Sequence, residues 1–307
     1  MVDPIIWLAF GAAIIAMLAL DLVLERRTAG AVPSMRASAI WSVIWTLVAL
    51  AFALILLPWR GGTAASEYLT GFVLERSLSL DNLFVFAMLF SYLAVPAKAQ
   101  RKVLFFGIIG AIVLRLVFIL AGGWLLDAVH WSVYLFGLLL IATGIRMALH
   151  GDEEIHPDRN PVLKLLDKTV PATTEYDGDK VFTHRDGHRL ATPMLAALAL
   201  VATFDVVFAV DSIPAIFAVT RDTFTVFAAN AFSLIGLASL YFLLEGMRDR
   251  FRHLNKGLAV VLVFIGVKML ITDLWHVPTA LSLAVILVAL TVSIIASPKA
   301  AQPAGAR

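Results

Sequence analysis

Two short polar motifs in the sequence carry residue types and a spacing that could bind a cation. In each motif an acid is followed, after five residues, by an aspartate and then by a small polar residue. The members are Glu75, Asp81 and Asn82 in the first motif and Asp205, Asp211 and Ser212 in the second. Carboxylate, amide and hydroxyl oxygens are the ligands that hard cations such as Mg²⁺, Ca²⁺ and Mn²⁺ prefer. The motifs therefore predict a site for a divalent metal ion.

Internal ion pairing is the alternative interpretation of these acids. Both motifs lie in long apolar segments, where each ionised acid costs ~2.5–3.5 kcal/mol near the centre of a bilayer. The basic residues available in such segments are Arg76, Arg115 and Lys268. In this alternative, Glu75 pairs with the adjacent Arg76, and the other acids pair with Arg115 or Lys268. We favour the metal site, because three cations do not obviously neutralise four acids in two matching motifs.

The composition requires a membrane around these motifs. Hydrophobic residues make up 61% of the 307 residues, charged residues 15%, and the mean hydropathy is +0.90. A soluble protein could not bury so much apolar surface. The chain is therefore expected to be an all-α polytopic membrane protein, with the lipid bilayer as an expected partner. About nine transmembrane helices are predicted, at 5–23, 39–57, 68–92, 104–126, 133–149, 192–217, 225–244, 258–271 and 278–295.

Charge distribution predicts the orientation of the chain. Of 24 lysines and arginines, 19 fall on the side of the C-terminal tail when the nine segments are threaded through a bilayer. The positive-inside rule then places the N-terminus outside and the C-terminus in the cytoplasm. The net charge of +2 gives no indication of a nucleic-acid partner. The hydrophilic connection 150–191 becomes a cytoplasmic loop, and the oligomeric state is not predicted.

The sequence predicts an inverted repeat within these segments. The match of the two motifs is followed by two weaker matches between short stretches. The stretch that begins at Arg115 resembles the one that begins at Ala238, and the stretch that begins at Gly144 resembles the one that begins at Gly266. The copies enter the membrane from opposite sides, an arrangement typical of transporters whose site lies between the repeats. The expected organisation is 1–66 (two helices), 67–149 (first three-helix repeat), 150–191 (loop), 192–271 (second, inverted repeat) and 272–307 (last helix and tail).

The chain resembles the TerC/Alx family of bacterial integral membrane proteins. The resemblance rests on residues 75–86, 205–222 and 264–269, and it runs from about residue 5 to residue 295. It implies a nine-helix inner-membrane protein with inverted repeats, manganese export and an association with tellurite resistance. The intramembrane acids of that family correspond here to Glu75, Asp81, Asp205 and Asp211. Many relatives carry Glu where Ala202 stands and Arg where Ala238 stands, and we interpret these two as a dispensable salt bridge rather than as a lost metal ligand.

The expected function is therefore export of Mn²⁺ by alternating access, with the ion as the transported substrate and no tightly bound cofactor. We find no nucleophile elbow, phosphate loop or HExxH motif, so we do not expect an enzyme. The alternative function is a non-transporting scaffold, or a component of the metal or tellurite stress response, whose acids form structural ion pairs.

Overall fold

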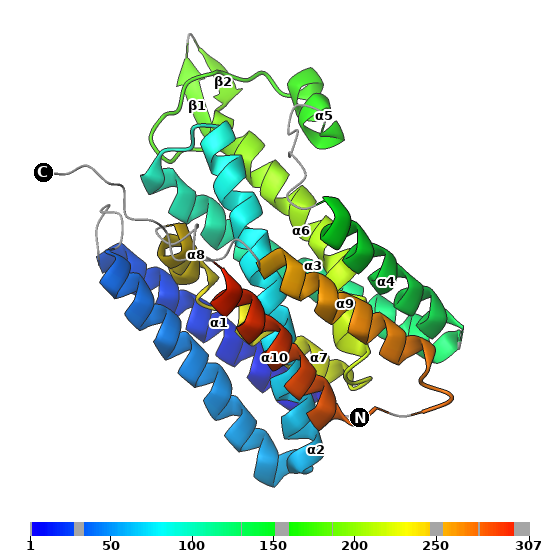
Figure 1. The fold of residues 1–307 in the computed structure, drawn as a ribbon. Coiled ribbons are helices and arrows are strands. Elements are labelled where there is room, and N and C mark those ends of the chain that lie inside the picture. The colour runs from blue at the N-terminus through cyan, green and yellow to red at the C-terminus, as the bar shows by residue number, and fades with distance from the viewer. Residues whose placement is uncertain are drawn as a thin grey trace, which may run out of the picture.

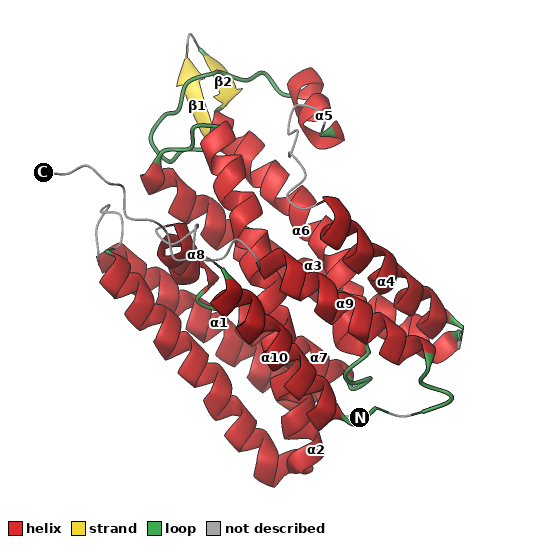
Figure 2. Ribbon diagram, viewed as in Figure 1, coloured by secondary structure: helices red, strands yellow, loops and turns green. Residues whose placement is uncertain are grey.

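The computed structural model describes residues 2–27, 34–129, 131–150, 160–185, 187–245, 254–275 and 277–297. Within these ranges the chain is a bundle of helices with a two-stranded sheet at one end (Figure 2). The side chains of Asp81 and Asp211 lie outside this description, although their backbone belongs to described helices. The bundle's helices are α1 Pro4–Arg27, α2 Met35–Tyr92, α3 Ala97–Ala128, α4 Ser132–His150, α6 Pro193–Phe217, α7 Thr223–Leu234, α8 Leu237–Glu245, α9 Leu254–Leu270 and α10 Thr279–Ala296.

Helix α2 contains a reversal of the chain. Its 58 residues include Pro58 and the non-helical Gly61, whose φ is 87°. Proline removes a backbone hydrogen-bond donor, and glycine adopts a positive φ without a steric penalty. In Figure 1 the first half of α2 runs away from the sheet and the second half returns toward it. The helix therefore contributes two antiparallel arms, and the motif with Glu75 lies on the second arm.

Six described helices are long and apolar enough to cross a membrane, or seven if the bent pair α7 and α8 forms one span. The two members of that pair meet at 46°. This result confirms a polytopic helical membrane protein. The exact count of nine spans remains a prediction, because α2 is counted once in spite of its reversal and α9, with 17 residues, is short.

Helix packing joins elements that are far apart in the sequence. The main contacts pair α4 with α9, α3 with α6, and α2 with both α7 and α8. Large apolar side chains such as Leu54 and Ile295 remain 70% and 77% exposed around the bundle. An exposed apolar surface of this kind is what a helical bundle presents to lipid.

Glycines allow α4 and α9 to approach closely at two levels. A Cβ atom on Gly137 would lie 3.0 Å from the carbonyl oxygen of Gly266, and one on Gly144 would lie 2.8 Å from that of Ala259. Small residues at such crossings are the usual means by which membrane helices pack closely. The two contacts are reciprocal, because Gly137 and Gly144 are separated by the same seven residues as Ala259 and Gly266.

The hydrophilic segment before α6 forms a small unit at one end of the bundle. It contains α5 Pro161–Thr169 and the strands β1 Phe182–Arg185 and β2 His188–Ala191, which pair antiparallel. Lys102 at the start of α3 pairs with Asp179 at 3.1 Å, and the Tyr176 hydroxyl donates to the carbonyl of Leu93 at 2.9 Å. These contacts anchor the segment to the α2–α3 end of the bundle.

Candidate functional site

A buried polar network joins the first acidic motif to two other helices. Glu75 on α2 is 0% exposed and Arg115 on α3 is 2% exposed. The Arg115 guanidinium forms an ion pair with the Glu75 carboxylate and donates a hydrogen bond to Oδ1 of Asn230 on α7 at 2.6 Å. The Asn230 amide in turn donates to the carbonyl of Val226 at 3.3 Å. One arginine therefore connects α2, α3 and α7 in the interior of the bundle.

The second motif reaches the same arginine. Asp205 on α6 is 7% exposed, and its carboxylate interacts electrostatically with Arg115. Glu75 and Asp205 occupy equivalent positions in the two motifs. Both acids are buried, as expected for carboxylates inside a membrane, and the guanidinium that forms the ion pair with Glu75 also acts electrostatically on Asp205. One positive charge leaves the pair of carboxylates with a net negative charge if both are ionised.

Several buried polar atoms of the two motifs have no hydrogen-bond partner in the described part of the chain. They are Oε2 of Glu75, Oγ of Ser79 and Oγ of Ser212. All three residues are at most 2% exposed, and Asn82 is 7% exposed. Buried polar groups in proteins are usually paired, so each of these unpaired oxygens is available to a polar ligand. Carboxylate and hydroxyl oxygens are suitable ligands for a hard cation.

Other members of the predicted ligand set are not described. Asp81 and Asp211 lie on α2 and α6, and their side chains are outside the described part of the structure. Among the side chains that the structure describes, no group of three or more His, Asp or Glu residues is arranged to hold a metal ion. The six-residue metal site therefore remains a prediction.

The alternative interpretation paired Glu75 with Arg76, but these two residues have other partners. Arg76 instead donates to the carbonyl oxygens of Ser233 at 2.6 Å and Ile235 at 3.3 Å, where α7 ends and the chain bends into α8. Adjacent residues on a helix point about 100° apart, which explains why Glu75 and Arg76 have different partners. Lys268 on α9 donates to the Ser282 hydroxyl at 3.1 Å and not to a described acid of the motifs.

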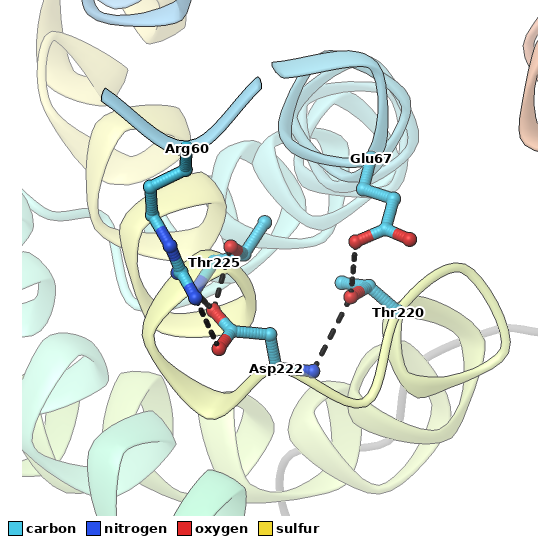
Figure 3. A network of polar contacts seen from close by, with 5 residues as sticks. All are labelled: Arg60, Glu67, Thr220, Asp222 and Thr225. Atoms are coloured by element: carbon cyan, nitrogen blue, oxygen red, sulfur yellow. Dashed lines mark hydrogen bonds and ion pairs between the residues drawn. The ribbon is translucent and has the colours of Figure 1, made fainter. Parts of the chain in front are cut away.

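A second polar network joins the reversal in α2 to the start of α7 (Figure 3), and that reversal lies at the opposite end of the bundle from the sheet (Figure 1). Arg60, beside the reversal in α2, donates to both carboxylate oxygens of Asp222, at 2.7 and 3.1 Å. Asp222 also caps the N-terminus of α7 by accepting from the backbone N–H of Thr225 at 2.8 Å. The Thr220 hydroxyl donates to Glu67 at 2.6 Å. The network ties the middle of α2 to the turn between α6 and α7.

Charge stabilises this network. Burial acts against ionisation of Asp222, but the hydrogen bonds from Arg60 and Thr225 outweigh it and hold the pKa of the Asp222 carboxyl below its usual range. Beside the network lies a cavity of about 200 Å³, whose polar lining includes Glu67, Arg221 and Lys268. The cavity is a water-accessible volume near the end of the bundle that bears the network.

Sequence reasoning did not identify Asn230, Arg60 or Asp222 as parts of polar networks. Asn230 is the one asparagine in the predicted segment 225–244, and an amide in an apolar segment was the available signal. Ala202 lies on the exposed face of α6, whereas Ala238 on α8 is 9% exposed. Because position 202 is exposed, a glutamate there would not be a ligand of the buried site, which argues that Ala202 does not replace such a ligand.

Comparison with known proteins relates the chain to one family. Residues 60–303 match the family described as "Integral membrane protein TerC family". The "Putative membrane-bound redox modulator Alx" of Escherichia coli (strain K12) is 44% identical over 291 residues, which cover 92% of this chain and 91% of that protein. Its counterpart in Salmonella typhi is 42% identical over 300 residues, covering 95% and 93% of the two chains. The "Uncharacterized membrane protein STKORF319" of Myxococcus xanthus is 44% identical over 295 residues, covering 96% and 92%. No solved structure gives a match.

Proposed function

Because the chain belongs to the TerC family of integral membrane proteins, we propose that it exports divalent cations, chiefly Mn²⁺, across the bacterial inner membrane. The observation that carries the proposal is the burial of Glu75 and Asp205, equivalent acids of two motifs, together with the buried Arg115 that pairs with Glu75. Buried carboxylates are costly in a membrane, and they typically mark ion pathways. The unpaired oxygens of Ser79 and Ser212 add neutral ligands of the kind that Mn²⁺ accepts.

The transport mechanism that we propose is alternating access between two inverted repeats. Reciprocal helix contacts support the repeat. The first helix of each copy packs against the second helix of the other, as α2 with α7 and α3 with α6, while the third helices, α4 and α9, pack against each other. The paired contacts of Gly137 with Gly266 and of Gly144 with Ala259 have the pattern that a two-fold axis would generate.

In this proposal the network of Arg60 and Asp222 closes the outer side of the protein. It joins the start of the first repeat to the second repeat at the end of the bundle where the N-terminus lies (Figure 1). A cation that leaves the central acids toward the outside must pass this end. Outward release therefore requires the ion pair between Arg60 and Asp222 to separate.

The second candidate function is a membrane scaffold whose acids form structural ion pairs. The pairing of Arg115 with Glu75 favours it, since an arginine already compensates one buried acid. Asp205 and the unpaired serine hydroxyls favour transport, because a purely structural role does not explain buried oxygens without hydrogen-bond partners. The two candidates differ in whether the acids are needed for metal export or only for folding.

Cellular manganese content distinguishes the two candidates. A strain lacking its own manganese exporters would express the wild type, Asp205→Asn, Asp81→Asn or Asp211→Asn during growth in excess Mn²⁺. Asp127→Asn is a matched control, because Asp127 is an exposed acid at the end of α3. Export predicts low cellular manganese with the wild type and the control and high manganese with the other variants. Low manganese with all variants, at equal membrane levels, contradicts the proposal.

A further inference from the structure

Arg115 is placed to compete with a bound cation. Its guanidinium contacts the Glu75 carboxylate and the Asn230 amide oxygen, and it acts electrostatically on Asp205. These are three oxygen-bearing groups on three helices, and all three groups are buried. A divalent cation at this position would be coordinated by the same oxygens.

We infer that Arg115 is a tethered cation that occupies the centre of the ion site when no metal is bound and must be displaced by the metal. The inference rests on the proposed function and assigns to this arginine a role in setting affinity and release. Displacement is feasible because the groups that hold the Arg115 guanidinium, Glu75 and Asn230, are groups of the site itself. Its Nε has no hydrogen-bond partner among the described residues.

The repeat gives the arginine a distinctive position. The second motif's equivalent of Arg115 is Ala238, which is buried and has no charge. The two equivalent acids, Glu75 and Asp205, therefore share one cation rather than one each. A site with two acids and one resident positive charge attracts a divalent ion, yet it regains partial neutrality when that ion leaves.

A competing group inside the site lowers the apparent affinity for its ligand. If the form with a displaced arginine makes up about a tenth of the molecules or less, the apparent Kd is raised at least about tenfold. The benefit for an exporter is release, because the returning guanidinium replaces the metal at its carboxylate. Removing the arginine should tighten metal binding and slow transport at the same time.

Arg76 provides a matched control. It neighbours Glu75 on the same helix and carries the same charge, but it binds backbone carbonyls at the end of α7 and not a carboxylate. Replacing it removes a buried arginine without removing the competitor. Arg115→Lys is the conservative variant, since it keeps the positive charge beside Glu75 but loses the planar fork.

The test measures Mn²⁺ binding by calorimetry on purified protein in detergent, together with Mn²⁺ flux in proteoliposomes. We expect Arg115→Gln to lower the Kd at least about tenfold while its flux falls. Arg76→Gln should leave the Kd unchanged or raise it, and Arg115→Lys should lie nearer the wild type. Added Mn²⁺ should also raise the melting temperature of Arg115→Gln more than that of the wild type. In this variant the metal neutralises the negative charge of the acids, which the arginine neutralises in the wild type.

The outcomes separate this inference from the proposed function. If the wild type transports Mn²⁺ but Arg115→Gln binds it with the same or a higher Kd, the arginine is structural and the inference is wrong. If neither the wild type nor Arg115→Gln binds or transports Mn²⁺, the proposed function fails, and this inference fails with it. If Arg115→Gln does not fold, Arg115→Lys replaces it in the test. A Kd of Arg115→Lys equal to that of the wild type supports competition by charge. A higher Kd of Arg115→Lys, together with a lower melting temperature, contradicts it.

Discussion

Arg60 donates two hydrogen bonds to Asp222, from the reversal in α2 to the first turn of α7, 162 positions further along the chain (Figure 3). In the proposed mechanism, the two segments that this pair links must separate for the outer side to open. The arginine and aspartate side chains are 26% and 32% exposed, so water can reach them when the contact breaks. An ion pair with partial solvent access can form and separate at modest cost.

Asp222 has two roles that different substitutions separate. Asp222→Asn keeps an N-cap for α7 but loses the ion pair, and we expect it to cost about 0.5–1 kcal/mol, since the pair is partly exposed. Asp222→Ala also loses the cap and should cost about 1 kcal/mol more. Thermal unfolding in detergent measures both. Equal melting temperatures for Asn and Ala variants would contradict the capping role seen at Thr225.

The contribution of the ion pair should depend on pH in one direction. The Asp222 pKa is held below its usual range, so the folded state favours the ionised form. The stabilisation is complete above the unfolded pKa of about 3.9 and is lost as the pH falls through the lower folded value. The difference in melting temperature between wild type and Asp222→Asn should therefore be constant from about pH 5 to pH 8 and shrink in stronger acid. A difference that grows as the pH falls would contradict this assignment.

The chain contains no cysteine, which permits a direct test of movement at this contact. The double variant Arg60→Cys/Asp222→Cys would be joined by a bifunctional reagent that links thiols and that a reductant cleaves. We expect the link to stop Mn²⁺ export and the reductant to restore it. Each single-cysteine variant treated in the same way should remain active. Full export by the linked protein would show that transport does not need this end to open.

Gly236 should tolerate no side chain. Its φ is +76° at the bend between α7 and α8, and an added Cβ would lie 2.5 Å from the ring of Trp45. Gly236→Ala combines backbone strain with overpacking and should cost about 2 kcal/mol or more. Gly110→Ala is the control, since an added Cβ at Gly110 meets no atom within 4 Å. A lower melting temperature is expected for Gly236→Ala alone, and equal losses in the two variants would contradict the packing at the bend.

Apolar segments predicted the helices well where tertiary contacts do not alter them. The segment 192–217 corresponds to α6 Pro193–Phe217, with Thr192 as its N-cap, and 133–149 corresponds to α4 Ser132–His150. Two segments differ for local reasons. Residues 58–67 were expected to connect two helices, but they remain helical on both sides of Gly61. The segment 225–244 divides at Gly236, where Trp45 and Arg76 hold the bend.

The burial of Glu75 and Asp205 was predicted, but the pairing of Glu75 with Arg115 was not. The cost of burying charge correctly places Glu75 and Asp205 in the interior, because this depends only on residue type. Which basic side chain pairs with which acid depends on the rotation of each helix about its axis. Sequence spacing does not fix that rotation between α2 and α3, so Arg115 could not be selected over Arg76 as the partner of Glu75. Asn230 was missed for the same reason.

Mn²⁺ flux through the purified protein in proteoliposomes tests the central claim most directly. A manganese-sensitive dye inside the vesicles would report the wild type, Asp205→Asn, Glu75→Gln and the control Asp127→Asn. We predict rapid flux for the wild type and the control, and a rate at least about tenfold lower for the two variants of the buried acids, as expected when about 1.4 kcal/mol or more of ion stabilisation is lost. Absence of flux in the wild type, or flux that is equal in all four folded proteins, would contradict export through these carboxylates.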